Sequence, residues 1–206
     1  MEKSVEHLIS RLRKKKSGPP VVIVSGLPRS GTSMMMRMLE NGGLFPLIDN
    51  QRTADDDNPR GYYEYELVKK LPEGNVAWLP LAQGKAVKVI SALLKYLPEG
   101  YSYQVLFMQR AIAEILASQR KMLYRRGEDA NKVNDSDMNR YFETHLAQVS
   151  EWMSSRRDFR VMYVDYNEFI RNPHPSVEEV NKFLGGKLDT DAMLSVVDPN
   201  LYRQRF

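Results

Sequence analysis

The stretch VVIVSGLPRSGTS at 21–33 constrains the fold of this 206-residue chain more than any other. Its apolar run, rich in β-branched residues, ends at a glycine and is typical of a strand buried on both faces of a parallel sheet. Gly26 and Gly31 then bracket four residues, and a helix is expected from Gly31 to about Glu40, with Asn41-Gly42-Gly43 as its stop. A strand, a glycine-rich turn and a helix in this order indicate an α/β protein.

The rest of the chain continues this alternation. Further strands are predicted at Lys85–Ile90, Tyr103–Gln109 and Phe159–Val164. Helices are predicted at 3–16, 62–71, 111–126 and 136–156, and a last one from a capping box at Ser176 to Gly185. Such βαβ units predict a single-domain parallel β-sheet flanked by helices, a P-loop-like three-layer sandwich. We expect one domain over 1–206, with its core at about 20–186.

Composition limits the classes of function. Hydrophobic residues make up 42% and charged residues 27% of the chain, as in ordinary globular domains. The net charge of +4 and the pI of about 9.2 suit an anionic ligand, but no clustered basic face points to a nucleic-acid partner. The chain has no cysteine and three scattered histidines, so we expect no metal site.

The sequence shows no membrane-spanning segment or secretory signal. No apolar run approaches the roughly 18 residues of a membrane span, so we expect a cytoplasmic protein. The basic run at 11–16 is interpreted as the solvated end of the first helix, with contact to anionic lipid or nucleic acid as the alternative. The methionine-rich run at 34–38 and His145 are both interpreted as core residues.

The glycine-bracketed turn has the spacing of a phosphate-binding P-loop, G-x-x-x-x-G-K-[ST], with one departure. Thr32 occupies the lysine position, and the nearest cation is Arg29. Glycines allow the backbone amides to surround an oxyanion, and the following helix presents the positive end of its dipole. We therefore predict an anion site here, with an ordinary strand–turn–helix corner as the alternative.

A second anion site is predicted after the Tyr103–Gln109 strand. Arg110 stands where a P-loop nucleoside triphosphatase would place a metal-binding carboxylate, and Ser118 follows in the next helix. A guanidinium fork with a hydroxyl suits a phosphate group, although Arg110 paired with a nearby carboxylate is the alternative. Two anion sites on neighbouring strand ends indicate a nucleotide with phosphates at two separate positions.

In these motifs the chain resembles the sulfotransferases that use 3′-phosphoadenosine 5′-phosphosulfate (PAPS). The family's loop P-R-S-G-T-[ST] is similar to Pro28–Ser33, and its R-x₇-S pair is similar to Arg110 and Ser118. A third element resembles Tyr166-Asn167-Glu168-Phe169 with Asn172-Pro173, although Asn167 replaces the family's glutamate, and Phe183-Leu184-Gly185 matches the end of the helix behind it. The resemblance covers about residues 20–186.

The resemblance implies a set of cofactor contacts. The residues that would hold the 5′-phosphosulfate are Pro28, Arg29, Ser30, Gly31, Thr32 and Ser33. Arg110 and Ser118 would hold the 3′-phosphate, and Tyr166 would lie against the adenine unless it is a core residue. Arg29 would neutralise the charge that develops on the leaving phosphate, and no metal is required.

In-line sulfuryl transfer also needs a base close to the acceptor. The segment 58–64, NPRGYYE, resembles an element of some bacterial members of the family, and Glu64 in it is the first choice for the base. Asp49 is a rival, and an exposed helix carboxylate is the alternative for Glu64. Lys88 resembles a lysine that certain members place near the sulfuryl oxygens, with a surface lysine at the sheet edge as the alternative.

We therefore predict a PAPS-dependent sulfotransferase that acts on a hydroxyl or amine and releases 3′,5′-adenosine bisphosphate. Its partners would be PAPS and an acceptor, and an oligomer is allowed because a second subunit could complete the acceptor pocket. One alternative is a divergent P-loop small-molecule kinase. The other is a protein that binds PAPS or a polyanion without catalysing transfer.

Overall fold

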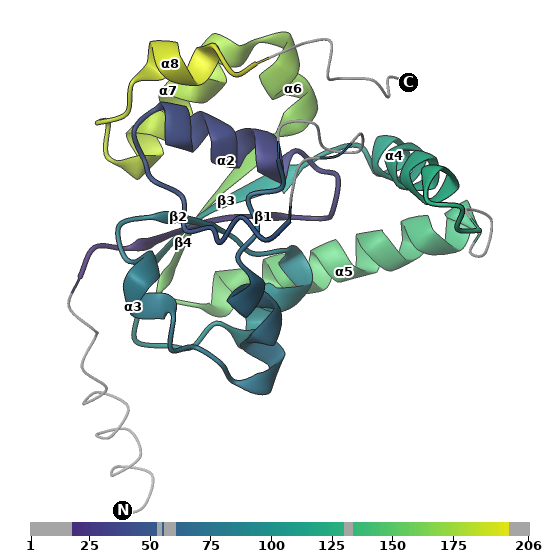
Figure 1. The fold of residues 1–206 in the computed structure, drawn as a ribbon, viewed down its shortest axis with the longest axis horizontal. Helices are drawn as coiled ribbons and strands as arrows, with labels where there is room; N and C mark the ends of the chain where they lie inside the picture. Colours follow the sequence, from purple (N-terminus) through teal and green to yellow (C-terminus); the bar gives the residue numbers. More distant parts are fainter. Residues whose placement is uncertain (1–17, 53–54, 56–60, 130–133, 198–206) are drawn as a thin grey trace, which may run out of the picture.

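A computed structural model describes residues 18–52, 55, 61–129 and 134–197 (Figure 1). Two expectations lie outside these residues: the helix at 3–16 with its basic end, and the Asn58-Pro59-Arg60 part of the segment 58–64. Within the described ranges, no helix is both long enough and apolar enough to cross a membrane.

Four parallel strands form the sheet of the described residues. They are β1 (Val21–Gly26), β2 (Ala86–Lys88), β3 (Tyr103–Gln109) and β4 (Phe159–Asp165), in the order β2-β1-β3-β4. Gly26 pairs with Met108 and Gln109 pairs with Asp165, so β1, β3 and β4 end at the same edge of the sheet. The segments that follow these strands are therefore neighbours, as expected for a ligand site at the carboxyl ends of parallel strands.

One face of the sheet is covered by four helices (Figure 1). These are α2 (Thr32–Asn41), α6 (Tyr166–Arg171), α7 (Pro173–Leu184) and α8 (Thr190–Leu194). Met35, Met36 and Met38 on α2 are fully buried against the sheet, which confirms their interpretation as core residues.

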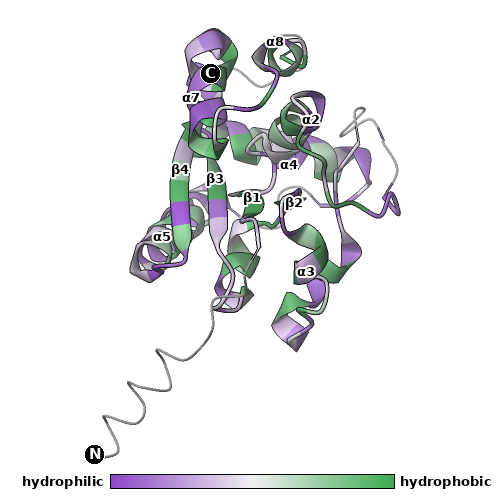
Figure 2. Cartoon of the chain, turned by 90° about the vertical axis from the view of Figure 1, so that its left-hand side faces the viewer, coloured by the Kyte–Doolittle hydropathy of each residue, from purple (hydrophilic) through white to green (hydrophobic). Residues whose placement is uncertain are grey.

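The other face is covered by shorter elements and one long helix, which completes the three layers seen edge-on in Figure 2. These elements are η1 (Glu66–Glu73), α3 (Leu79–Ala82), η2 (Ser91–Tyr96) and α5 (Asp135–Ser155). His145 on α5 lies 2.8 Å from the hydroxyl of Ser91 on η2, a contact that supports its interpretation as a structural residue. The remaining helix, α4 (Ile112–Arg125), packs against α5 beyond the carboxyl edge of the sheet (Figure 1).

Three local predictions differ from the structure. The helix expected at 62–71 is a 3-10 helix that begins only at Glu66, because Tyr63 has a left-handed backbone with φ of 54°. The capping box at Ser176 is wrong, since α7 begins earlier, at Pro173, where a proline suits the first helical position. The strand expected at Lys85–Ile90 is shorter, Ala86–Lys88.

Candidate functional site

The turn between β1 and α2 is held in a tight, strained conformation. Gly31 and the non-glycine residue Arg29 both have left-handed backbone angles, with φ of 98° and 73°. A Cβ at Gly26 would lie 2.6 Å from the Met108 carbonyl oxygen, and one at Gly31 would lie 2.3 Å from the Tyr166 ring. The two glycines are therefore required by close approach as well as by backbone angle.

The same turn buries polar groups that suit an oxyanion. Ser30 is 1% exposed, and its hydroxyl has no hydrogen-bond partner in the described part of the chain. Its backbone N–H donates to the Leu27 carbonyl at 3.2 Å, which closes the turn. No side chain caps the N-terminus of α2, and its first turn has no acidic residue. A buried hydroxyl beside a helix N-terminus is a donor set that matches a phosphate or sulfate oxygen.

Arg110 and Ser118, the predicted second anion site, both touch this turn. Arg110 Nη1 donates to the backbone carbonyl of Arg29 at 3.0 Å. The Arg29 Nε in turn donates to the Ser118 hydroxyl at 2.9 Å. Three residues predicted to bind two separate phosphates therefore lie in one connected arrangement.

Arg110 also has a carboxylate partner, which is the alternative that the sequence left open for this residue. Its Nε donates to Glu114 at 2.8 Å, one helical turn further along α4, and both side chains are less than a tenth exposed. The guanidinium also lies over the Tyr166 ring, 4.7 Å from its centre. Tyr166 is itself buried, between Arg110 and Gly31. The carboxylate pair and the contact with the turn coexist, so the two interpretations of Arg110 are compatible.

Lys88 points into the site. The alternative of a surface lysine is wrong, because its side chain is 8% exposed. Its ammonium donates to the Tyr62 carbonyl and to the Ser33 hydroxyl, the latter at 3.4 Å, and lies 3.8 Å from Glu64. Burial lowers the pKa of Lys88 to about 8, although Glu64 partly opposes this shift.

The two candidate bases have different surroundings. The Glu64 carboxylate contacts Arg52 at 2.9 Å and Lys69 at 3.4 Å in addition to Lys88. Asp49 instead accepts backbone hydrogen bonds, from Gln51 at 3.1 Å and from Glu66 at 2.6 Å. Glu64 is thus linked to the turn between β1 and α2 through Lys88, whereas the Asp49 carboxylate helps to start η1.

Two contributors to the site were missed. Glu114 stands four residues after Arg110, a spacing at which helical side chains meet, so the sequence contains its signal. The backbone carbonyl of Tyr62, which accepts from both Lys88 and Ser33, has no such signal. No group of three histidine, aspartate or glutamate side chains gathers as a metal site among the residues that the structure describes.

Comparisons with known proteins identify the family and the fold of the chain. The family described as "Sulfotransferase domain" matches residues 19–202. The sulfotransferase domain of the Synechococcus PCC 7002 olefin synthase is similar in fold, with a TM-score of 0.56 and 15% identity over 93% of this chain and 86% of that one. Sulfotransferase STF9 from Mycobacterium avium has a TM-score of 0.53 and 13% identity over 98% and 73%. A search of curated proteins found no match.

Proposed function

The chain belongs to the sulfotransferase domain family, and we propose that it transfers a sulfuryl group from PAPS to a hydroxyl or amine. The turn from Pro28 to Ser33 would hold the 5′-phosphosulfate, and Arg110 with Ser118 would hold the 3′-phosphate. When bound, PAPS supplies an activated sulfuryl group whose bond to the 5′-phosphate breaks on transfer.

One observation carries this proposal: the chain of contacts from Arg110 to the Arg29 carbonyl and from Arg29 to Ser118. It brings a guanidinium and a hydroxyl next to a turn of main-chain amides. A nucleotide with one phosphate at each end of its ribose could touch both groups, whereas AMP could satisfy only one. The buried Ser30 hydroxyl adds a donor inside the turn that an oxyanion would pair.

The remaining side chains have roles that follow from charge and position. Lys88 contacts Ser33 in the turn, and the guanidinium of Arg29, a residue of the turn, contacts Ser118. These two cations would stabilise negative charge that develops on the leaving phosphate. Glu64 is our first choice for the group that takes the proton from the acceptor, because it reaches the turn through Lys88. Asp49 is second, since its carboxylate is already engaged with backbone amides.

The kinase alternative has less support. A P-loop kinase uses a loop lysine and an acidic metal ligand, but Thr32 and Arg110 occupy the corresponding places. A protein that binds PAPS without catalysis would share the same anion sites. Only the transfer reaction itself separates that alternative from an enzyme.

Calorimetry of the whole chain tests the donor. We expect 3′,5′-adenosine bisphosphate to bind more tightly than AMP and than ATP with Mg²⁺. Arg110→Ala should abolish the preference over AMP. This variant leaves the buried Glu114 carboxylate without its cation. The double variant Arg110→Ala with Glu114→Gln avoids that buried charge, so it should show the same loss of preference with a better preserved fold. Tighter metal-dependent ATP binding would reject the proposal.

Transfer of radiolabelled sulfate from PAPS to a panel of alcohols, phenols and amines tests catalysis. A labelled product that disappears in Lys88→Met would support an enzyme. Binding of the bisphosphate with no product from any acceptor class would favour the non-catalytic alternative.

A further inference from the structure

We propose that Asn167 is a positioning residue that, through Glu114, directs the Arg110 guanidinium toward a 3′-phosphate and adds no second negative charge beside it. This inference rests on the proposed function. It concerns the position at which this chain departs from the family motif, where an amide replaces a carboxylate.

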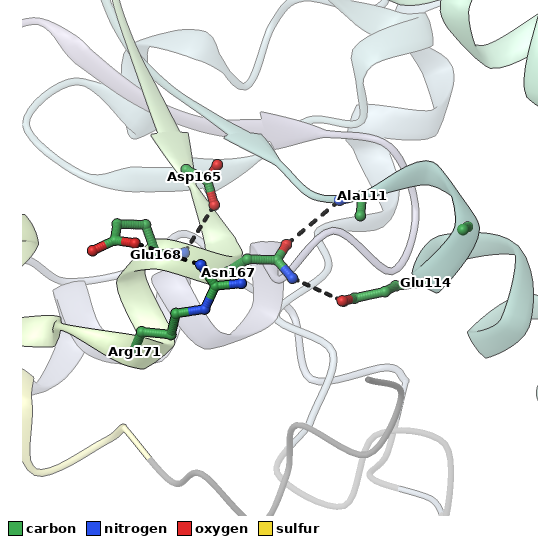
Figure 3. Close-up of a pocket in the computed structure, with 7 residues that line it drawn as sticks. Ala111, Glu114, Asp165, Asn167, Glu168 and Arg171 are labelled. Atoms are coloured by element: carbon green, nitrogen blue, oxygen red, sulfur yellow. Dashed lines mark hydrogen bonds and ion pairs between the residues drawn. The ribbon is translucent and has the colours of Figure 1, made fainter. Parts of the chain in front are cut away.

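The contacts form a short relay between two elements (Figure 3). Asn167 Nδ2 on α6 donates to Glu114 Oε1 on α4 at 2.8 Å, as Figure 3 shows. Outside that view, Glu114 Oε2 accepts from Arg110 Nε at 2.8 Å. The Asn167 Oδ1 also accepts from the backbone N–H of Ala111, at 3.5 Å. One amide therefore joins the start of α4 to the start of α6.

In this chain, the contacts of position 167 favour an amide. Glu114 is only 3% exposed, so each of its oxygens needs a donor or a cation. An asparagine can donate to Glu114 while it accepts from Ala111, whereas an ionised carboxylate can only accept. A carboxylate at 167 would place a second negative charge against the buried one, and like charges at this distance repel.

The charge balance affects the phosphate site directly. One arginine and one carboxylate in this pair are neutral together, and the guanidinium is held between Glu114, the Arg29 carbonyl and the Tyr166 ring. A second carboxylate would draw Arg110 away from the turn and make the local potential negative. Binding of a 3′-phosphate would weaken, while a ligand without that phosphate would be little affected.

A cavity of about 400 Å³ opens beside Asn167 and Glu114 (Figure 3). Its charged lining consists of Glu114, Asp165, Glu168 and Arg171. Glu168 and Arg171 lie 3.8 Å apart, and Asp165 caps α6 by accepting from the Glu168 amide. Among the residues that the structure describes, these and Arg110 are the charged groups near position 167 on α4, on β4 and α6, and at the end of β3.

The test measures the ratio of affinities for 3′,5′-adenosine bisphosphate and AMP by calorimetry at pH 8. Asn167→Asp should lower this ratio about tenfold or more, because it adds a negative charge next to the buried pair. The double variant Glu114→Gln with Asn167→Asp exchanges the amide and the carboxylate and should recover most of the ratio. If Asn167 contributed to stability alone, Asn167→Asp would lower the melting temperature but would leave the ratio of affinities unchanged.

The chain offers a matched control on α5. Asn139 Nδ2 also donates to a glutamate, Glu143, at 2.8 Å, but this hydrogen bond is exposed and lies outside the site. Asn139→Asp makes the same chemical change and should leave the ratio unaltered. If Asn167→Asp does not fold, Asn167→Ala removes the donor without adding charge and should lower the ratio about threefold.

The outcomes separate the relay from the proposed function. A wild-type chain with no preference for the bisphosphate would overturn both. A wild-type preference that survives within twofold in Asn167→Asp, or in Asn167→Ala where only that variant folds, would overturn the relay and leave the proposed function intact. The relay would also be overturned if Asn167→Asp lowered the ratio and the double variant Glu114→Gln with Asn167→Asp did not restore it.

Discussion

Arg29 and Ser118 are 89 residues apart in the sequence, yet the Arg29 Nε donates a hydrogen bond of 2.9 Å to the Ser118 hydroxyl. Arg29 belongs to the turn after β1, and Ser118 belongs to the helix after β3. Because β1 and β3 are adjacent and parallel, the two following segments meet at the sheet edge. The contact joins the two predicted anion sites, so each should influence the other.

Ser118→Ala tests that link. The change removes a hydroxyl beside the expected 3′-phosphate and the acceptor that orients Arg29. Hydrogen bonds to charged groups contribute about 1.5–3 kcal/mol, so calorimetry should show a loss of about tenfold or more in affinity for 3′,5′-adenosine bisphosphate. AMP should lose less. Ser154→Ala on α5, where the hydroxyl bonds only to nearby helix carbonyls, is the control and should leave both affinities unchanged. Equal losses for the two nucleotides would contradict the assignment of Ser118.

The turn between β1 and α2 could be predicted because its signals are local. The positions of Gly26 and Gly31, the buried strand before them and the helix after them all follow from neighbouring residues. The meeting of Arg110 with the turn followed from a single topological rule, the alignment of parallel strand ends. These parts of the fold and site needed no knowledge of distant contacts.

The segment at 62–65 could not be predicted in this way. Its backbone is set by tertiary contacts: the Tyr63 hydroxyl donates to Glu40 on α2 at 2.5 Å, and the Tyr62 carbonyl accepts from Ser33 and Lys88. These contacts hold Tyr63 in a left-handed conformation that ordinary helix propensity does not anticipate. The backbone at 62–65 is therefore harder to predict from the sequence than the turn between β1 and α2.

Gly31→Ala should disrupt the turn more than its backbone angle alone explains. Gly31 and Gly43 have nearly equal φ values, 98° and 95°, but only at Gly31 would a Cβ meet another atom, 2.3 Å from the Tyr166 ring. The two alanine variants have a similar backbone cost, so any difference in stability comes from the clash with Tyr166. Denaturant unfolding should therefore show Gly31→Ala to be less stable than Gly43→Ala by about 1–3 kcal/mol. It should also lose nucleotide binding, whereas Gly43→Ala should retain it. Equal stabilities would show that Tyr166 moves aside easily.

Because Lys88 is buried, we expect ligand affinity to fall at alkaline pH. Burial lowers the pKa of the Lys88 ammonium to about 8, so the cation is present below that pH and is lost as the pH rises through it. Affinity for 3′,5′-adenosine bisphosphate should therefore fall between about pH 7 and 9. A bound anion favours the charged form, so the limit should move to higher pH in the complex. Lys88→Arg, which keeps its charge, should remove this limit if calorimetry shows that it still binds. A wild-type affinity that stays constant over this range would argue against a charged role for Lys88.

The buried pair of Arg110 and Glu114 predicts a specific pattern of stability. Removing one partner leaves the other charge buried, so Arg110→Met should lower the free energy of unfolding by about 3 kcal/mol or more. Arg110→Met combined with Glu114→Leu removes both charges and should recover much of that loss in denaturant titrations. Lys70→Met breaks the pair with Glu73, whose side chains are more than half exposed, and should cost less than about 1 kcal/mol. If Arg110→Met cost no more than Lys70→Met, water would have to reach Glu114, and the geometry that holds Arg110 against the phosphate turn would be looser than described.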